Sequence, residues 1–220
     1  MIKIRIGLFL FLNLLTLGRL FAQEDNKHNL FFHLENSNIL IRGLENRIQI
    51  SSNLGGDYTV TSKSAAIILK NDNNFTVNPI HVKEDNLILD VVSIKNPKVR
   101  NSVKFKIINV PIPTIQIGVI EPGLNLDRTS ILNQIALHAT LTNFFYEGAR
   151  CVVKSYTLNY MKNHGGVQRI ESIKVEGNSL DNLRSILKTI EPGVKLEFTQ
   201  INVTTPSENI VINNVVFSLK

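Results

Sequence analysis

Residues 102–113 read Ser-Val-Lys-Phe-Lys-Ile-Ile-Asn-Val-Pro-Ile-Pro, and this stretch contains both features that decide the fold. Residues 102–107 alternate polar and apolar side chains, as a strand does when one face meets a core and the other meets water. Pro111 and Pro113 follow, and because proline fixes φ and has no N–H donor, the pair favours a stiff, extended link. The stretch therefore predicts a strand that ends one domain, followed by the connection to the next.

The same alternation recurs on both sides of this link. It is present in residues 47–51, 195–199 and 215–219, and turn-forming residues separate the apolar runs. Short strands divided by turns at roughly 8–12-residue spacing are typical of β-sandwiches and barrels. We therefore expect a mainly β protein with two domains, over residues 30–110 and 111–220.

One segment, at about residues 179–191, has helical periodicity instead. Its apolar side chains recur on one stripe, formed by Leu180, Leu183, Ile186, Leu187 and Ile190. Ser179 can cap the start, and Pro192-Gly193 ends the segment. The second domain is therefore expected to carry one α-helix whose stripe packs on a sheet.

Two other stretches leave alternatives open. Residues 129–139 fit a short helix, whereas residues 139–145 could equally begin a strand. In residues 151–160, the apolar side chains change phase between Val153 and Tyr156. Either both faces of that strand are covered, or a β-bulge shifts its register.

Residues 1–22 have the three parts of a secretory signal peptide. Lys3 and Arg5 supply positive charge, a short apolar run follows, and Ala22 ends a cleavage-like segment. An uncleaved membrane anchor is the alternative, but Arg19 interrupts the apolar run before the ~20 residues that a spanning helix needs. We expect cleavage after about Ala22 and a protein that works outside the cytoplasm.

Removal of this segment changes what the charge implies. The formal net charge falls from +6 to +3, because Lys3, Arg5 and Arg19 leave with the signal and no acid precedes Glu24. The remaining Lys and Arg residues are scattered and are not interleaved with aromatics, as they would be in a nucleic-acid groove. We expect no nucleic-acid partner.

Catalytic and metal-binding patterns are lacking in the sequence. No two of the five histidines are spaced as metal ligands on one element; they are His28, His33, His81, His138 and His164. We expect His138 to be an interior histidine. The single cysteine, Cys151, excludes an internal disulfide framework, and we interpret it as a small buried hydrophobe; a nucleophile and an intermolecular disulfide are the alternatives.

The carboxylates give no clear acid–base pair either. The pairs Glu24-Asp25 and Glu84-Asp85, and the single Glu121, lie in or beside polar segments. The chain has no G-x-S-x-G elbow, phosphate loop or dinucleotide fingerprint. We therefore expect no enzyme, no catalytic, cofactor-binding or metal-binding residue and no cofactor, and the partner-binding residues stay unassigned.

Several segments, taken in chain order, resemble the GldM/PorM family of gliding motility and type IX secretion. Residues 104–113 resemble the family's F-x-V-x-x-V-P-x-P linker, and residues 191–198 its L-x-P-G-x-x-x-x-F element after a helix. Residues 39–46 look like the strand that enters its G-x-D/E-N turn. Further similar pieces are residues 139–145, residues 151–158 and the chain end at 215–220.

The resemblance implies two Ig-like β-sandwich domains, the second similar to the GldM C-terminal domain, and a place in the periplasm. It implies envelope proteins of a secretion or gliding apparatus as partners, with a second copy of the chain as another candidate. The family's transmembrane helix and helical domain have no counterpart here. Arg47 stands where the family usually has proline, and Ile112 where it usually has an acidic residue.

We therefore expect a non-enzymatic periplasmic structural or interaction protein that resembles the last two domains of GldM/PorM. An exported carbohydrate- or ligand-binding β-sandwich is the alternative, with Tyr156, Tyr160 and Phe144-Phe145-Tyr146 as stacking candidates. A hydrolase whose site is split across loops is a third hypothesis.

Overall fold

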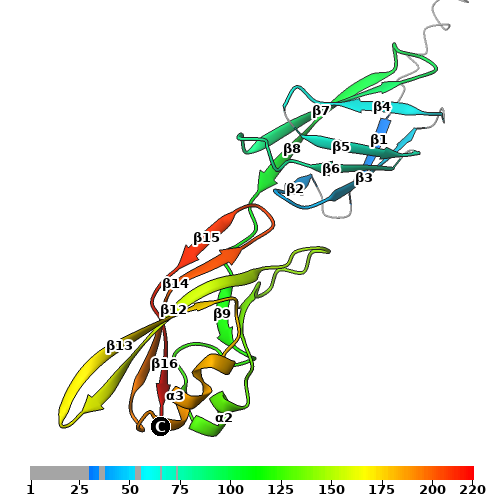
Figure 1. Ribbon diagram of the computed structural model, residues 1–220. Coiled ribbons are helices and arrows are strands. Elements are labelled where there is room, and N and C mark those ends of the chain that lie inside the picture. The colour runs from blue at the N-terminus through cyan, green and yellow to red at the C-terminus, as the bar shows by residue number, and fades with distance from the viewer. Residues whose placement is uncertain (1–29, 35–37, 53–55, 65, 73) are drawn as a thin grey trace, which may run out of the picture.

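A computed structural model of the protein describes residues 30–34, 38–52, 56–64, 66–72 and 74–220. The signal-like residues 1–22, the pair Glu24-Asp25 and His28 lie outside this described part. The described strands form two groups that follow each other along the chain, one on each side of residues 110–113 (Figure 1). The predicted mainly β fold with two tandem domains is confirmed.

The first domain contains two four-stranded sheets. One has the order β1 (Leu30–Leu34), β3 (Asn46–Ser52), β6 (Asn74–Asn78) and β5 (Ile67–Asn71). The other has the order β2 (Ile39–Ile41), β8 (Arg100–Ile108), β7 (Asn86–Ser93) and β4 (Tyr58–Thr61). All neighbours are antiparallel except β2 and β8, which run parallel. Side chains of both sheets share one buried cluster, so the domain is a β-sandwich.

Alternating side chains explain why these segments are half-buried strands. In β3, Ile48 and Ile50 are buried while Arg47 and Gln49 face water. In β8, the buried Phe105 alternates in the same way with exposed lysines on either side. Both strands were predicted from this pattern, and both are confirmed.

The second domain is built on a larger sheet. Its strand order is β10 (Asn125–Leu126), β16 (Val215–Leu219), β14 (Lys195–Thr204), β12 (Val152–His164) and β13 (Val167–Glu176). A further strand, β15 (Asn209–Ile212), pairs with β14. A separate two-stranded sheet consists of β9 (Thr114–Ile117) and β11 (Leu137–Thr140).

Three aromatic rings form the centre of the second core. The rings of Tyr156 and Phe198 lie 5.5 Å apart, and the ring of Phe217 meets Phe198 edge-on at 5.8 Å. These residues come from β12, β14 and β16, and the buried Ile115 and Ile117 of β9 belong to the same cluster. The small sheet and the helices therefore share one core with the large sheet.

The predicted helix at about residues 179–191 exists, but it is shorter. It consists of a 3₁₀ turn, η1 (Asp181–Leu183), followed by α3 (Arg184–Thr189). The first residues of the predicted segment are in strand-like pairing instead, because Ser179 forms a bridge with Ala136 and Leu180 N–H donates to Ile135 O. The Ser179 hydroxyl accepts from Asp181 N–H but lies before the capping position.

The two ambiguous stretches are now settled. A short helix, α2 (Arg128–Leu132), ends before Asn133, and β11 follows it, so the region contains both a helix and a strand. The change of phase in β12 is a β-bulge, since the pairing with β14 shifts register between Val153 and Thr157. Within the described ranges, no helix is long and apolar enough to cross a membrane.

Candidate functional site

The histidines of the described part do not converge. His81 and His138 are exposed on different domains, and His164 lies near the end of β12. The prediction that His138 is interior is wrong, because Leu137 takes the core-facing phase of β11 and its neighbour must then face water. His33 lies on β1 of the first domain. Among the described residues, no three His, Cys, Asp or Glu side chains are grouped as metal ligands.

Cys151 lies just before β12 and is partly buried. It packs against the second core, and partial burial raises the pKa of its thiol, which favours the neutral form over the nucleophilic thiolate. Glu84, Asp85 and Glu121 are exposed. The three carboxylates are therefore solvated, as expected, whereas Cys151 is less buried than its interpretation as a small buried hydrophobe implied.

The aromatic side chains suggested for ligand stacking do not share one surface. Tyr156 and Tyr160 are buried in the second core, and Tyr156 Oη donates to Ser179 O at 2.7 Å. Phe144 and Tyr146 stack on each other at 6.3 Å and pack between the domains. Phe145 is 94% exposed and belongs to neither group. The five side chains thus do not form a binding platform.

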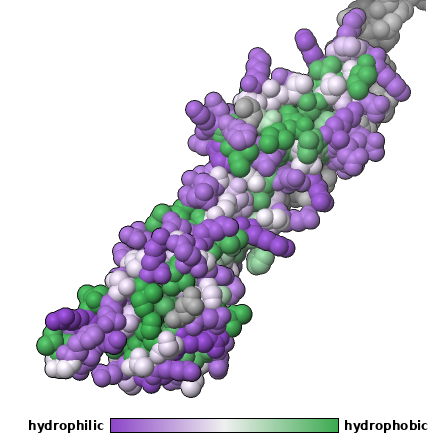
Figure 2. All heavy atoms as spheres, in the orientation of Figure 1, coloured by the Kyte–Doolittle hydropathy of each residue, from purple (hydrophilic) through white to green (hydrophobic). Residues whose placement is uncertain are grey.

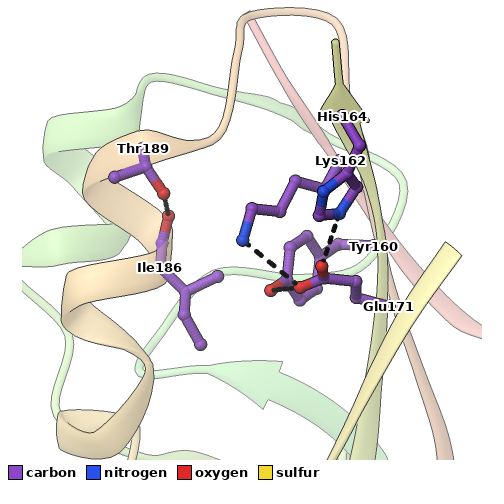
Figure 3. A network of polar contacts seen from close by, with 6 residues as sticks. All are labelled: Tyr160, Lys162, His164, Glu171, Ile186 and Thr189. Carbon is purple, nitrogen blue, oxygen red and sulfur yellow. Dashed lines mark hydrogen bonds and ion pairs between the residues drawn. The ribbon is translucent and has the colours of Figure 1, made fainter. Parts of the chain in front are cut away.

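A polar network joins the two strands of the β12–β13 hairpin (Figure 3). Glu171 is its centre: its carboxylate accepts from Tyr160 Oη at 2.7 Å, lies 2.7 Å from His164 Nε2 and pairs with Lys162 Nζ at 3.6 Å. Hydrogen bonds from Tyr160 and His164 lower the pKa of Glu171. Burial, with the bond to Glu171, raises the pKa of Tyr160 to about 12. The network keeps an ionised carboxylate between the strands.

A small cavity separates this hairpin from the end of α3. Its volume is about 140 Å³, and Lys162, Gln168, Thr189 and Glu191 are among the lining residues. Ligand pockets are commonly about 300–1,000 Å³. Thr189 Oγ1 is already bonded to Ile186 O at 2.9 Å (Figure 3). The cavity suits a few water molecules rather than a sugar or a cofactor.

The most elaborate group of contacts is the junction between the two domains, and Asn46 is at its centre. This side chain is 1% exposed. Its Oδ1 accepts from Ile41 N–H at 2.7 Å and from Tyr146 Oη at 2.9 Å. Its Nδ2 lies within 3.0 Å of the carbonyl oxygens of Ile41, Leu44 and Val77. One buried amide thus ties two strands of the first domain to a loop of the second.

Apolar side chains from both domains surround this amide. Ile41, Leu44 and Val110 are buried in a cluster separate from the two domain cores. Side chains of the loop between β11 and β12 pack on it: Leu141, Phe144, Tyr146 and Ala149. At the rim, Arg47 Nη2 pairs with Glu147 Oε2 at 3.5 Å. The junction therefore has its own small core.

Gly43 brings a second loop into the junction. Its φ is +80°, and a Cβ at this position would collide with the carbonyl oxygen of Pro206, in the turn between β14 and β15. Glycine alone provides both the left-handed backbone and the missing volume. This glycine therefore allows the β14–β15 turn to touch the first domain.

Only part of this junction could be recognised from the sequence. Residues 39–46 were singled out as a strand entering a turn, and Gly43 and Asn46 are the residues that now matter there. Tyr146 and Pro206 carried no comparable signal, because their roles depend on contacts across 100 residues or more of chain. Phe144 and Tyr146 were noticed, but as ligand-stacking candidates.

The fold and the junction define a class of protein: two β domains in tandem, held end to end by a buried polar and apolar contact. Residues 111–220 match the family described as GldM C-terminal domain. This match spans half of the chain, and the protein belongs to the GldM family. A comparison with curated proteins finds no match.

The two departures from the family pattern lie near the boundary between the domains. Arg47, where proline is usual, forms the rim ion pair with Glu147. Ile112, where an acidic residue is usual, is 80% exposed between the two prolines of the link. One departure therefore adds a contact across the junction, and the other places an apolar side chain in water.

Proposed function

We propose that this protein works in the periplasm as a non-enzymatic structural and interaction component of a gliding or type IX secretion apparatus. Membership of the GldM family supports an assignment to this machinery. The signal-like residues 1–22 support export. In this proposal, the protein binds envelope proteins through strand edges and loops rather than converting a substrate.

The observation that carries the proposal is the junction between the domains. A flexible link would leave the two sandwiches free to move, as the modest interfaces within multidomain chains commonly do. Here Asn46, Tyr146 and the surrounding apolar cluster fix the second domain against the first. A spacer between two binding surfaces needs such a fixed arrangement of its domains, because a rigid connection transmits position and force from one surface to the other.

Crosslinking in intact cells tests this proposal. The tagged full-length protein is treated with a short crosslinker, its envelope fraction is isolated, and mass spectrometry identifies both the mature N-terminus and the captured proteins. We expect an N-terminus at about Gln23 and captured envelope components of the secretion or gliding apparatus. A matched version lacking residues 1–22 should capture none of them.

The same cells also show whether the protein binds a second copy of itself as well as an envelope partner. Two differently tagged copies are expressed together, and each tag is recovered separately. A crosslinked product that contains both tags identifies self-association in addition to an envelope partner. Recovery of the protein solely as a monomer from crosslinked envelopes would contradict the proposed role.

A further inference from the structure

We propose that two copies of this chain associate through β15 (Asn209–Ile212), whose free edge pairs antiparallel with the same edge of the second copy. β15 lies at the border of the second domain, and β14 is its only neighbour among the described strands (Figure 1). The inference assigns a surface and a register to self-association, and it does not depend on the envelope partner proposed above.

Main-chain groups of alternate residues in β15 point away from β14. Thr205 N–H donates to Glu208 O at 2.9 Å, which marks these two residues as a hydrogen-bonded pair at the turn. Bonded and non-bonded pairs alternate along an antiparallel ladder, so Ile210 bonds to β14 whereas Asn209 and Val211 face outward. Among the described residues, no backbone group pairs with Asn209 or Val211 on that outer side.

The side chains at this edge do not protect it from pairing. Exposed edges are commonly protected by charged residues or proline. The outer strand β13 carries both basic and acidic residues, whereas residues 209–213 contain no charged residue and no proline. Val211 is apolar and yet 57% exposed, and Ile210 and Ile212 pack only partly against the second core. Figure 2 shows apolar surface in the part of the second domain that adjoins the first, where Figure 1 places β15.

The sequence of this edge selects a second copy of the chain as its occupant. Residues 209–213 read Asn-Ile-Val-Ile-Asn, which is the same in both directions. When this strand pairs antiparallel with itself about Val211, each asparagine faces an asparagine, each isoleucine faces an isoleucine, and the two copies of Val211 face each other. The same register places Glu208 opposite Asn214, so no two like charges meet. A two-fold interface requires such self-complementarity.

The free main-chain groups fit this register. The two copies of Val211 form a hydrogen-bonded pair, because the N–H and C=O of each face outward. Ile212 C=O points to β14, so the N–H of Asn213, on the opposite side of the trans peptide, points outward and meets Asn209 C=O of the second copy. The facing strands run in opposite directions, and β15 runs roughly along the long axis of the molecule (Figure 1), so the two first domains point to opposite ends.

The direct test measures association of the protein without residues 1–22 by sedimentation velocity. A single strand pair covers less than the ~1,600 Å² of a standard interface, so the concentrations run from about 10 µM to about 1 mM. We expect a monomer at the low end and a dimer at the high end. Exchange of the Val211 amide hydrogen should be slower in the dimer by about tenfold, the size that one net hydrogen bond produces.

Cysteine substitutions test the register in a Cys151→Ser background. Val211→Cys places two thiols across the two-fold axis, where the Cα atoms of a hydrogen-bonded pair are about 5.5 Å apart, a separation that suits a disulfide. Val167→Cys is the matched control, because Val167 is 56% exposed. Under mild oxidation, Val211→Cys should crosslink about tenfold faster than this control. Asn209→Cys should crosslink with Asn213→Cys in a mixture, and neither with itself.

Charge substitutions separate association from folding defects. Val211→Lys and Val211→Glu each place two like charges opposite each other and should weaken the dimer at least several-fold. A mixture of these two variants should associate again, because unlike charges then face each other, and a misfolded variant cannot show this recovery. Val167→Lys alters an equally exposed valine and should associate like the wild type.

Three results would overturn the inference. One is a wild-type monomer at every concentration. Another is crosslinking at Val211 that is no faster than at Val167. The last is a mixture of the two charge variants that associates no better than either alone.

In intact cells, Val211→Lys should lose the crosslinked product that contains both tags and keep the captured envelope proteins. Loss of the envelope proteins instead, with the doubly tagged product retained, would assign this edge to an envelope partner and overturn the inference. If the wild type captures no envelope protein but still forms the doubly tagged product, the envelope role is rejected and the β15 interface stands.

Discussion

At the scale of single residues, the side chain of Asn46 stands out because one small amide connects the two domains. Its amide lies within hydrogen-bond distance of five polar groups from two domains while it is almost completely excluded from water. A buried polar group left without a partner is costly, so loss of this side chain weakens the polar contacts around it.

Replacing Asn46 with alanine is expected to destabilise the protein by about 3 kcal/mol, because the substitution removes a buried amide and the hydrogen bonds that it forms with groups of both domains. Chemical denaturation measures the change. Asn38→Ala is the matched control, since Asn38 is an exposed asparagine in the same domain. Equal stability of the two variants would show that the buried amide contributes nothing beyond its local turn.

Gly43 and Gly123 separate two effects of glycine. Both have φ near +80° (+80° and +83°), but a Cβ meets Pro206 at Gly43 and nothing within 4 Å at Gly123. Gly123→Ala should therefore cost only the left-handed strain, about 1 kcal/mol. Gly43→Ala should cost clearly more and displace the β14–β15 turn. Thermal unfolding and amide shifts near Pro206 measure both, and equal costs would argue against the close contact.

At the scale of elements, a titratable polar network centred on Glu171 stabilises the β12–β13 hairpin. Because the folded state lowers the pKa of Glu171, its ionised form stabilises the fold. That stabilisation is present at neutral pH and disappears as the pH falls through the lowered pKa.

Glu171→Gln is expected to reduce stability at neutral pH and to approach the wild type as the pH falls below the lowered pKa of Glu171, where the carboxylate is protonated in the folded and the unfolded state. Denaturation across this range, combined with exchange of the hairpin amides, measures the effect. Glu121→Gln is the control, since Glu121 is exposed. A difference from the wild type that is constant with pH would contradict the role assigned to the charge.

The elements also show what sequence patterns can and cannot predict. Residues 47–51 and 195–199 became strands as expected, because alternation records the burial of one face directly. The predicted helix lost its first turn because Ser179 and Leu180 pair with residues far away in the chain. Periodicity describes a segment's own faces and contains no information about such partners. His138 was misplaced for a related reason, since its apolar neighbours did not reveal which of them faced inward.

At the scale of the whole molecule, the junction determines how the domains move relative to each other. Its apolar cluster includes Phe144 but not the adjacent Phe145, which is in water. The two phenylalanines therefore form a natural pair of test and control.

Phe144→Ala is expected to loosen the junction while both domains stay folded, because each domain has its own larger core. Small-angle scattering should show a broader distribution of shapes, and the amide protection around Asn46 should fall. Phe145→Ala should leave both measurements unchanged. The same result from the two variants would show that packing at this loop does not hold the domains together.

The parallel pairing of β2 and β8 has a mechanical consequence. β2 lies near the start of the first domain and β8 at its end, and Ile39–Ile41 pair in register with Lys106–Ile108. Tension between the N-terminal side and the second domain pulls these two strands in opposite directions along their axes. Their hydrogen bonds are then loaded together, in shear, rather than opened one after another. In single-molecule pulling, the first domain should resist such tension better than a force applied across β7 and β8, whose antiparallel bonds would unzip from Asn86 or Ser93.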